Sequence, residues 1–291
     1  MKPFYAIDLT TDPDNETAHA EEFLVAQPSA GMLNALKEAA EKTDDTVTKA
    51  VKPPFLLRMA QWITGAIALF ALLVLIKLLG EGKELLYQAF RAKPLLFVGG
   101  GLCLGLWAAL KVLCIRREKA LLSSEEGTQT ISNLEIACNN IYRALSVPAD
   151  AKDVEILSFF YKVKKGKLKV CEKPLQLYSH RCYTFKMYVQ DEMLCLTCLQ
   201  GKYAFPLSSL QGIRRVDEKI RIESWSKGES IHSDTYQQYR MTTDRYGCVH
   251  SKPHYILELT RGDESWGIYF PCYELPAFEE LTGKEAPKPK K

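Results

Sequence analysis

The residue types best suited to metal binding occur around one cysteine pair. Cys195 and Cys198 have CxxC spacing, but a zinc site normally takes a second pair of ligands. The residues that could supply that pair are scattered along the sequence: His180, Cys182, Cys248 and His250. Cys195 and Cys198 also fall in a predicted strand, residues 193–199, where side chains three positions apart point to opposite faces. We therefore expect ordinary buried thiols and surface imidazoles, and no metal or other cofactor.

Lysine residues gather in a segment that the sequence predicts to be a β-hairpin. A strand that ends at residue 163, a Lys-Lys-Gly-Lys turn and a second strand at 168–171 have hairpin spacing. The candidate residues for contact with an anionic surface are Lys162, Lys164, Lys165, Lys167 and Lys169. Two interpretations stay open. The segment is a docking site for anionic lipid headgroups or an acidic protein partner, or a solvated ribbon whose lysines protect a strand edge.

Motifs of the common enzyme classes do not accompany these residues. The sequence has no glycine-rich phosphate loop after a strand, no GxSxG and no HExxH. Acids such as Asp217 and Glu218 fall in predicted turns, where solvation explains them, so no residue is predicted to be catalytic. A net charge of +3, spread evenly along the chain, excludes a nucleic-acid-binding protein, which would concentrate Lys and Arg on one face.

Two uncharged stretches predict a transmembrane hairpin at residues 55–115, with helices at about 56–79 and 94–115. Residues 59–76 carry no charge and, with their apolar neighbours, reach the ~20 residues that a hydrocarbon core of roughly 30 Å requires. The second helix has an uncharged run at 95–110. A buried helix pair of a soluble protein is the alternative, but soluble cores seldom contain two such runs.

Small residues on both helices predict close packing. Gly101 and Gly105 have the small-xxx-small spacing that lets membrane helices approach each other, and the first helix offers Gly65, Ala68 and Ala71. Packing within the hairpin and a homodimer through Gly101 and Gly105 both stay open.

Basic residues near the helix ends predict the orientation of the hairpin. Four of them precede the first helix and four follow the second, whereas the loop at 80–93 has three, offset by two acids. Translocated short loops are poor in Lys and Arg, so we expect an integral protein of the plasma membrane with both termini in the cytoplasm. Nine cysteines without regular spacing agree with a cytoplasmic soluble domain, because disulfides are rare in that compartment.

The segments around the hairpin are predicted from apolar spacing and caps. Residues 1–54 form a cytoplasmic N-terminal segment, with an amphipathic helix at 29–43 that lies on the membrane or on the soluble domain. Residues 116–150 form a connector, in which a Ser-x-x-Glu capping box opens a helix at 132–145.

Alternating apolar residues and polar turns predict a β domain at residues 151–283. After the lysine hairpin, strands are predicted at 183–189, 193–199, 203–207, 213–216, 220–225, 255–260 and 266–270. A polar loop at 226–253 interrupts them, a short helix at 276–281 closes the domain, and residues 284–291 form a basic tail. The spacing of the strands indicates an antiparallel meander.

An antiparallel meander closed by a C-terminal helix resembles the pleckstrin-homology-like (PH-like) superfold. Residues 201–210, Gly-Lys-Tyr-Ala-Phe-Pro-Leu-Ser-Ser-Leu, are similar to the strand and turn that such domains place before an Ile-x-x-Val strand. The layout of roughly residues 55–281 resembles bacterial membrane proteins in which a two-helix hairpin precedes a PH-like domain. The resemblance implies a membrane α-hairpin plus a soluble α+β domain, and it puts the lysine hairpin where PH domains have a headgroup-binding loop.

These observations favour a non-enzymatic, membrane-anchored cytoplasmic module for binding, scaffolding or sensing. The alternative is a membrane-associated enzyme or transport accessory subunit without a recognisable motif. Neither predicted helix has an acidic residue in its middle, which argues against a transporter acting alone. The predicted partners are the lipid bilayer and either anionic lipid headgroups or a protein.

Overall fold

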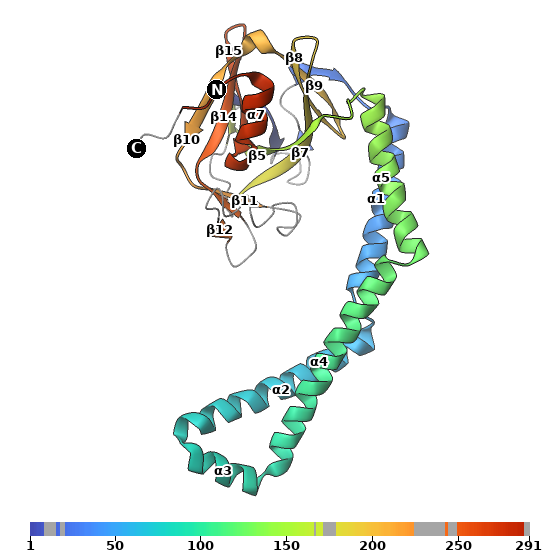
Figure 1. The fold of residues 1–291 in the computed structure, drawn as a ribbon, viewed down its shortest axis with the longest axis vertical. Helices are drawn as coiled ribbons and strands as arrows, with labels where there is room; N and C mark the ends of the chain where they lie inside the picture. The colour runs from blue at the N-terminus through green and yellow to red at the C-terminus, as the bar shows by residue number, and fades with distance from the viewer. Residues whose placement is uncertain are drawn as a thin grey trace. The chain divides into compact units, whose positions relative to one another are not determined.

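The computed structural model describes residues 1–8, 16–17, 21–165, 167–170, 179–223, 242–243 and 249–287, and the chain forms two compact units (Figure 1). Residues 31–139 form a unit of helices, called the helical unit below. Residues 1–30 and 140–291 form a unit built mainly of strands, called the β unit. The predicted α+β layout, with two long apolar helices and a mostly antiparallel sheet domain, is confirmed.

The helical unit is a succession of helices separated by proline, glycine and serine residues. The helices are Ala30–Val51 (α1), Phe55–Glu81 (α2), Lys83–Ala92 (α3), Pro94–Leu122 (α4) and Glu125–Ala144 (α5). Pro54 precedes α2, and Pro94 occupies the first turn of α4, where a missing N–H is tolerated. Gly82 separates α2 from α3 with a φ of 123°, a backbone conformation that favours glycine.

Three helices differ in extent or existence from the sequence prediction. The predicted helix at 29–43 continues to Val51 as α1, and α3 lies within the predicted loop at 80–93. The connector helix begins at Glu125 instead of residue 132, because Ser124 caps it: the Gly127 N–H donates to Ser124 Oγ at 3.1 Å. A Cβ atom at Gly127 would lie 2.4 Å from the Leu121 carbonyl oxygen, so this tight turn requires glycine.

The pair of long apolar helices, α2 and α4, packs through Gly65 and Ala71 of the first helix, as predicted, but on the second helix through Gly100 and Trp107 instead of Gly101 and Gly105. A Cβ atom at Gly100 would lie 2.4 Å from the Ala71 Cβ, and one at Gly65 would lie 3.1 Å from the Trp107 ring. At Gly101 and Gly105, in contrast, an added Cβ would meet nothing within 4 Å. The Gly101 and Gly105 pair therefore takes no part in the packing of the hairpin, and a homodimer through these residues stays a prediction.

Two sheets form the described part of the β unit. In the first, Lys152–Lys164 (β5), Ser179–Gln190 (β7), Met193–Cys198 (β8) and Gly201–Pro206 (β9) pair antiparallel in chain order. In the second, Leu210–Val216 (β10), His254–Arg261 (β14) and Glu264–Pro271 (β15) pair antiparallel, and the helix Leu275–Thr282 (α7) follows. These seven strands and the closing helix lie where they were predicted, but the predicted single meander is interrupted, because β9 and β10 belong to different sheets.

Further strands extend the first sheet. Ile220–Glu223 (β11) pairs parallel with β7 and antiparallel with Val249–Ser251 (β13), which pairs in turn with Thr242–Thr243 (β12). β12 and β13 both fall within the predicted loop at 226–253, and the rest of that loop is outside the described residues apart from residues 252–253. The end of the predicted tail, residues 288–291, is outside them as well.

Residues 1–54, predicted as one N-terminal segment, divide between the two units. Lys2–Pro3 (β1) lies parallel to β15, and Ala6–Asp8 (β2) lies parallel to β5. Glu16–Thr17 (β3) pairs with β2, and Leu24–Ala26 (β4) pairs antiparallel with β9. The beginning of the chain thus supplies strands to sheets whose other strands come from residues 152–271.

Aromatic side chains of these first strands fill the core of the β unit. Phe4 is 1% exposed, and its ring centre lies 5.1 Å from that of Tyr203 and 5.0 Å from that of Phe205. At the other end of the chain, Phe278 of α7 stacks on Phe270 with ring centres 3.8 Å apart. Both termini of the chain are therefore needed to complete one hydrophobic core.

Replacing Phe4 with alanine should lower the free energy of unfolding of the β unit by about 3–5 kcal/mol, the usual cost of deleting a buried phenylalanine side chain. Val25→Ala in β4 is the control, because Val25 is 57% exposed and its truncation should cost about 0.5 kcal/mol or less. Urea unfolding of the full chain in detergent, followed by near-ultraviolet circular dichroism, measures both. Equal stability of the two variants would contradict a structural role for the N-terminal strands.

Candidate functional site

The predicted lysine hairpin is a two-stranded ribbon formed by the end of β5 and Lys167–Val170 (β6). Lys162 pairs with Lys169 and Lys164 pairs with Lys167. Directly opposed positions share a face of an antiparallel pair, and so do positions two apart on one strand. Positions 162, 164, 167 and 169 therefore belong to one face. The side chains of these four lysines are outside the described residues, whereas Lys165 is exposed in the turn with a φ of 54°.

The cysteine pair of β8 is divided between two hydrophobic clusters. Cys195 packs with Tyr188 and Ala204, and Cys198 belongs to the main core of the β unit. The predicted opposite directions of the two side chains are confirmed, so both sulfurs cannot bind one metal ion. Of the four residues considered as partner ligands, the side chains of His180, Cys182 and Cys248 are outside the described residues, and His250 is half-buried.

Two half-buried glutamates, Glu155 and Glu274, link β5 to the short helix Cys272–Glu274 (η3). The Glu155 backbone N–H donates to Glu274 Oε1 at 3.0 Å, and the Tyr273 hydroxyl donates to the Glu155 carboxylate. The two segments are thus joined by two hydrogen bonds, one in which Glu155 donates to Glu274 and one in which Tyr273 donates to Glu155. Because η3 leads directly into α7, this pair of bonds fixes the position of the helix that closes the core.

The surroundings of the Glu155 and Glu274 side chains disfavour their ionised forms. Burial, reinforced by the charges of Glu155 and Asp153, raises the pKa of Glu274 to about 7, although the bond from the Glu155 N–H opposes the rise. Burial also raises the pKa of Glu155, and the Tyr273 hydroxyl opposes it. The nearby lysines form ion pairs with other acids: Lys186 pairs with Asp153 at 2.7 Å, and Lys152 pairs with Glu280.

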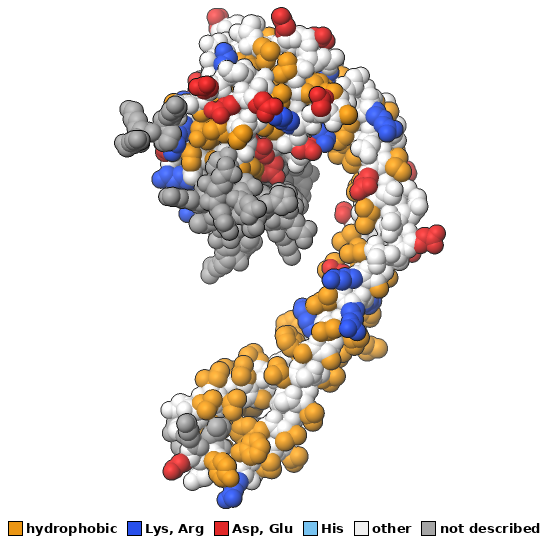
Figure 2. All heavy atoms as spheres, in the orientation of Figure 1, with side chains coloured by type: hydrophobic (Ala, Val, Ile, Leu, Met, Phe, Trp, Pro, Cys, Tyr) orange, Lys and Arg blue, Asp and Glu red, His pale blue; other side chains and the backbone are white. Residues whose placement is uncertain are grey.

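Seven cations lie on the helical unit at the end of α1, the start of α2 and the later turns of α4, and we call them the basic collar. It consists of Lys49, Lys52, Arg58, Lys111, Arg116, Arg117 and Lys119. Arg117 holds the collar together, because its Nη1 and Nη2 atoms donate to the carbonyl oxygens of Lys52 and Lys49, each at 3.3 Å. These bonds satisfy carbonyls at the C-terminal end of α1. Figure 2 shows Lys and Arg side chains gathered on this part of the helices.

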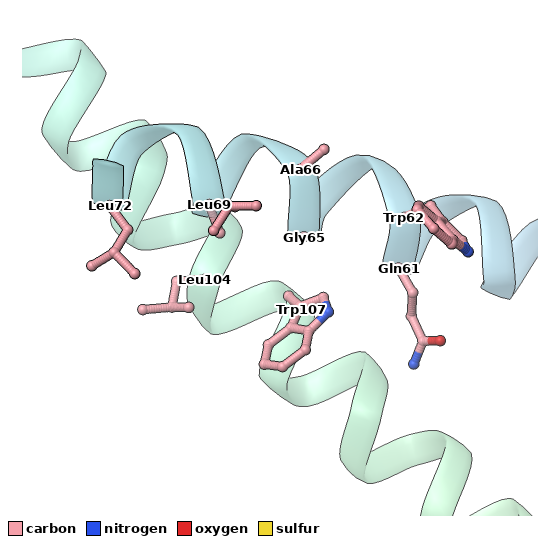
Figure 3. A pocket seen from close by; sticks show the side chains of 9 residues that line it. Gln61, Trp62, Gly65, Ala66, Leu69, Leu72, Leu104 and Trp107 are labelled. Atoms are coloured by element: carbon pink, nitrogen blue, oxygen red, sulfur yellow. The ribbon is translucent and has the colours of Figure 1, made fainter. Parts of the chain in front are cut away.

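A groove with a cavity volume of about 550 Å³ runs between α2 and α4. Figure 3 shows Gln61, Leu72, Leu104 and Trp107 directed into the space between the two helices. The lining is hydrocarbon apart from the Gln61 amide and the indole N–H groups of two tryptophans. Gln61 Nε2 lies 3.2 Å from Cys114 Sγ, to which it donates, so its polar end is already engaged with α4.

Comparison of the chain with protein-family models, curated proteins and solved structures finds no match.

Sequence reasoning found the lysine ribbon and used the collar cations for orientation, but it missed the carboxyl pair and the groove. Glu155 and Glu274 are 119 positions apart, and no local sequence pattern predicts the hydrogen bond between them. The groove depends on how two uniformly apolar helices cross, which their composition does not determine. Gly65, whose missing side chain admits the Trp107 ring, was singled out from the sequence, but for close packing of the helices and not for a groove beside it.

Replacing Glu274 with glutamine should make the stability of the β unit less dependent on pH. Folding raises the pKa of Glu274 from about 4.5 to about 7, so the folded state binds the proton more tightly and stability falls as pH rises between these values. The glutamine side chain keeps an oxygen that accepts from the Glu155 N–H and carries no charge. Relative to the wild type, E274Q should therefore gain on the order of 2 kcal/mol between about pH 5 and about pH 8.

The measurement is urea unfolding of the full chain at several pH values, with the exposed Glu280→Gln as the charge-matched control. An E274Q variant whose stability follows the same pH curve as the wild type would contradict the assignment.

Proposed function

We propose that the chain is an integral protein of the plasma membrane, anchored by α2 and α4, whose β unit is a non-enzymatic binding or scaffold module at the cytoplasmic surface. One observation carries the proposal: the two longest apolar helices of the described chain have almost nothing covering them. Phe55–Gly80 and Phe97–Leu122 are each 26 residues long, and 11% and 6% of their most apolar windows are buried.

Exposure of this kind is unfavourable in water, and the lipid bilayer removes the cost. Large apolar side chains such as Phe70, 62% exposed, and Leu102, 70% exposed, lie on both helices, and Figure 2 shows hydrophobic side chains along them. Soluble monomers rarely expose contiguous apolar patches beyond a few hundred Å². A helix of 26 residues is about 39 Å long, enough for a hydrocarbon core of roughly 30 Å.

The distribution of cations around these helices supports cytoplasmic termini. The basic collar lies at the end that carries α1 and the last turns of α4, with Glu118 as its nearest acid in the chain. At the other end, residues 80–93 contribute Lys83, Arg91 and Lys93, offset by Glu81 and Glu84. The excess of Lys and Arg on the collar side is the pattern of a cytoplasmic flank. The amphipathic α3, with exposed Tyr87 and Phe90, suits the opposite interface.

The order of strands supports a PH-like β unit. A four-strand antiparallel succession, β5, β7, β8 and β9, is followed by the three strands β10, β14 and β15 and by α7. This is the layout that PH-like domains have, with β6 and β11–β13 as additions and with the N-terminal strands packed against both sheets. The analogy concerns architecture, and the binding function rests on the lysine ribbon.

The lysine ribbon supplies the binding surface of this proposal. Four lysine positions lie on one face by register, and near an anionic leaflet each Lys contributes about 1 kcal/mol. Attachment of the β unit to the same membrane raises the effective concentration of the surface it meets, so weak individual contacts suffice. We propose that the ribbon contacts anionic lipid headgroups.

Hydrogen exchange of the full chain in nanodiscs tests this function. Amides of residues 161–170 should exchange more slowly in nanodiscs that contain phosphatidylglycerol than in nanodiscs of phosphatidylcholine alone. Raising the salt concentration should remove the difference, because it screens the attraction. Substitution of Lys162, Lys164, Lys167 and Lys169 by glutamine should have the same effect.

Lys219→Gln with Lys252→Gln is the control, since both lysines are exposed on the β unit outside the ribbon. If the exchange rates of these amides depend neither on lipid charge nor on the four substitutions, the ribbon is a solvated hairpin and does not bind lipid. A chain that fails to enter nanodiscs would refute the membrane anchor itself.

A further inference from the structure

We propose that the groove between α2 and α4 holds one acyl chain of an anionic phospholipid, whose headgroup Arg58 and Lys111 bind at the end of the groove. This inference rests on the proposed membrane location of the two helices. It assigns a specific lipid site to the anchor, separate from the surface contact proposed for the lysine ribbon.

The shape and chemistry of the groove fit a hydrocarbon chain. Its volume of about 550 Å³ lies between two helices that touch closely at only some positions, such as Gly100 with Ala71. Leu69, Leu72, Leu104 and the two tryptophan rings give it an apolar surface. A void lined in this way loses dispersion contacts unless a flexible apolar group fills it, and acyl chains are the apolar groups of the bilayer.

The charges at one end of the groove identify the headgroup. Arg58 is three residues before Gln61 on α2, and Lys111 is four residues after Trp107 on α4. Residues three or four apart lie on the same face of a helix. Arg58 and Lys111 therefore lie on the helix faces that line the groove, one turn beyond its end. Both side chains are exposed. Among the residues that the structure describes, no acid forms an ion pair with either cation.

Charge complementarity selects a lipid over a second copy of the chain as the occupant. Two copies in the same orientation would bring Arg58 and Lys111 of both chains to the same level of the membrane, where like charges repel. An anionic phospholipid instead carries a phosphate at the level of the collar and an acyl chain below it. A zwitterionic lipid has the same phosphate but also an ammonium group, which offsets the attraction.

Tail-brominated lipids test the site directly, because bromine quenches tryptophan fluorescence on contact. The full chain is placed in nanodiscs of phosphatidylcholine that contain a minor fraction of brominated phosphatidylglycerol or, separately, brominated phosphatidylcholine. Trp62 and Trp107 line the groove, whereas Trp266 is buried in the core of the β unit. The fourth tryptophan, Trp225, is outside the described residues and is replaced by phenylalanine in every protein that is tested. We expect the anionic lipid to quench at about 25-fold lower mole fraction, since each of the two cations near an anionic headgroup adds about a factor of five.

Two charge variants distinguish a specific lipid site from nonspecific attraction of anionic lipids to the basic collar. Arg58→Gln with Lys111→Gln should abolish the advantage of the anionic lipid, and Arg116→Gln with Lys119→Gln, which removes the same charge from neighbouring collar positions, should keep it. Trp107→Phe should remove much of the quenching in the unaltered charge background. These results together would support the site.

Other outcomes overturn the inference. Equal quenching by the two lipids would show that the groove has no preference for an anionic headgroup. Equal losses in the two charge variants would show that the whole collar attracts anionic lipids diffusely. Incorporation of the chain without quenching by either lipid would exclude an acyl chain beside Trp107. If the chain does not incorporate at all, the proposed membrane function fails as well.

Discussion

The apolar surface of α2 and α4 is the constraint on which the arrangement of the helical unit depends. Each helix has hydrophobic side chains around most of its circumference, so neither can hide that surface by turning one face toward a partner. Their mutual packing covers only a narrow strip, centred on Gly65 with Trp107 and Gly100 with Ala71. The charged residues of α2 and α4 themselves lie toward the ends of the two helices.

The β unit meets a different constraint, because its core must be closed by both ends of the chain. The helical unit is inserted between Ala30 and Asn140, so strands on both sides of the insertion must pair. Tyr5 shows how this is done: its ring packs against Phe185, and its hydroxyl donates to Gln200 at 2.6 Å. Because of this insertion, the chain connects the β unit to the helical unit twice, at α1 and at α5.

The parts of the fold that the sequence predicts are those with a local cause. Uncharged runs predicted α2 and α4, and alternation predicted β7 to β10, β14 and β15, because each pattern reflects a single face or a single environment. The N-terminal strands escaped prediction since β1 and β2 are two and three residues long, too short for a pattern. Their register is fixed by Trp266 and Phe159 far along the chain.

The candidate sites follow the same division. The lysine ribbon is contiguous in sequence and was predicted residue by residue. Alternation along the strands predicts that alternate lysines share a face, but the pairing puts positions 162, 164, 167 and 169 on that face and leaves Lys165 in the turn. The carboxyl pair of Glu155 and Glu274 depends on where η3 packs against β5, and the groove depends on how two helices cross. Tertiary packing decides both, and single-sequence patterns do not encode it.

Reporter fusions give the most direct test of the central claim that α2 and α4 cross the membrane with the β unit on the cytoplasmic side. A phosphatase that is active only outside the cytoplasm is inserted at Gly82, between α2 and α3, or fused after Lys291. The account predicts activity for the Gly82 insertion and none for the C-terminal fusion, while a fluorescent protein that folds only in the cytoplasm gives the opposite pattern. Phosphatase activity after Lys291, or cytoplasmic fluorescence at both positions, would contradict it.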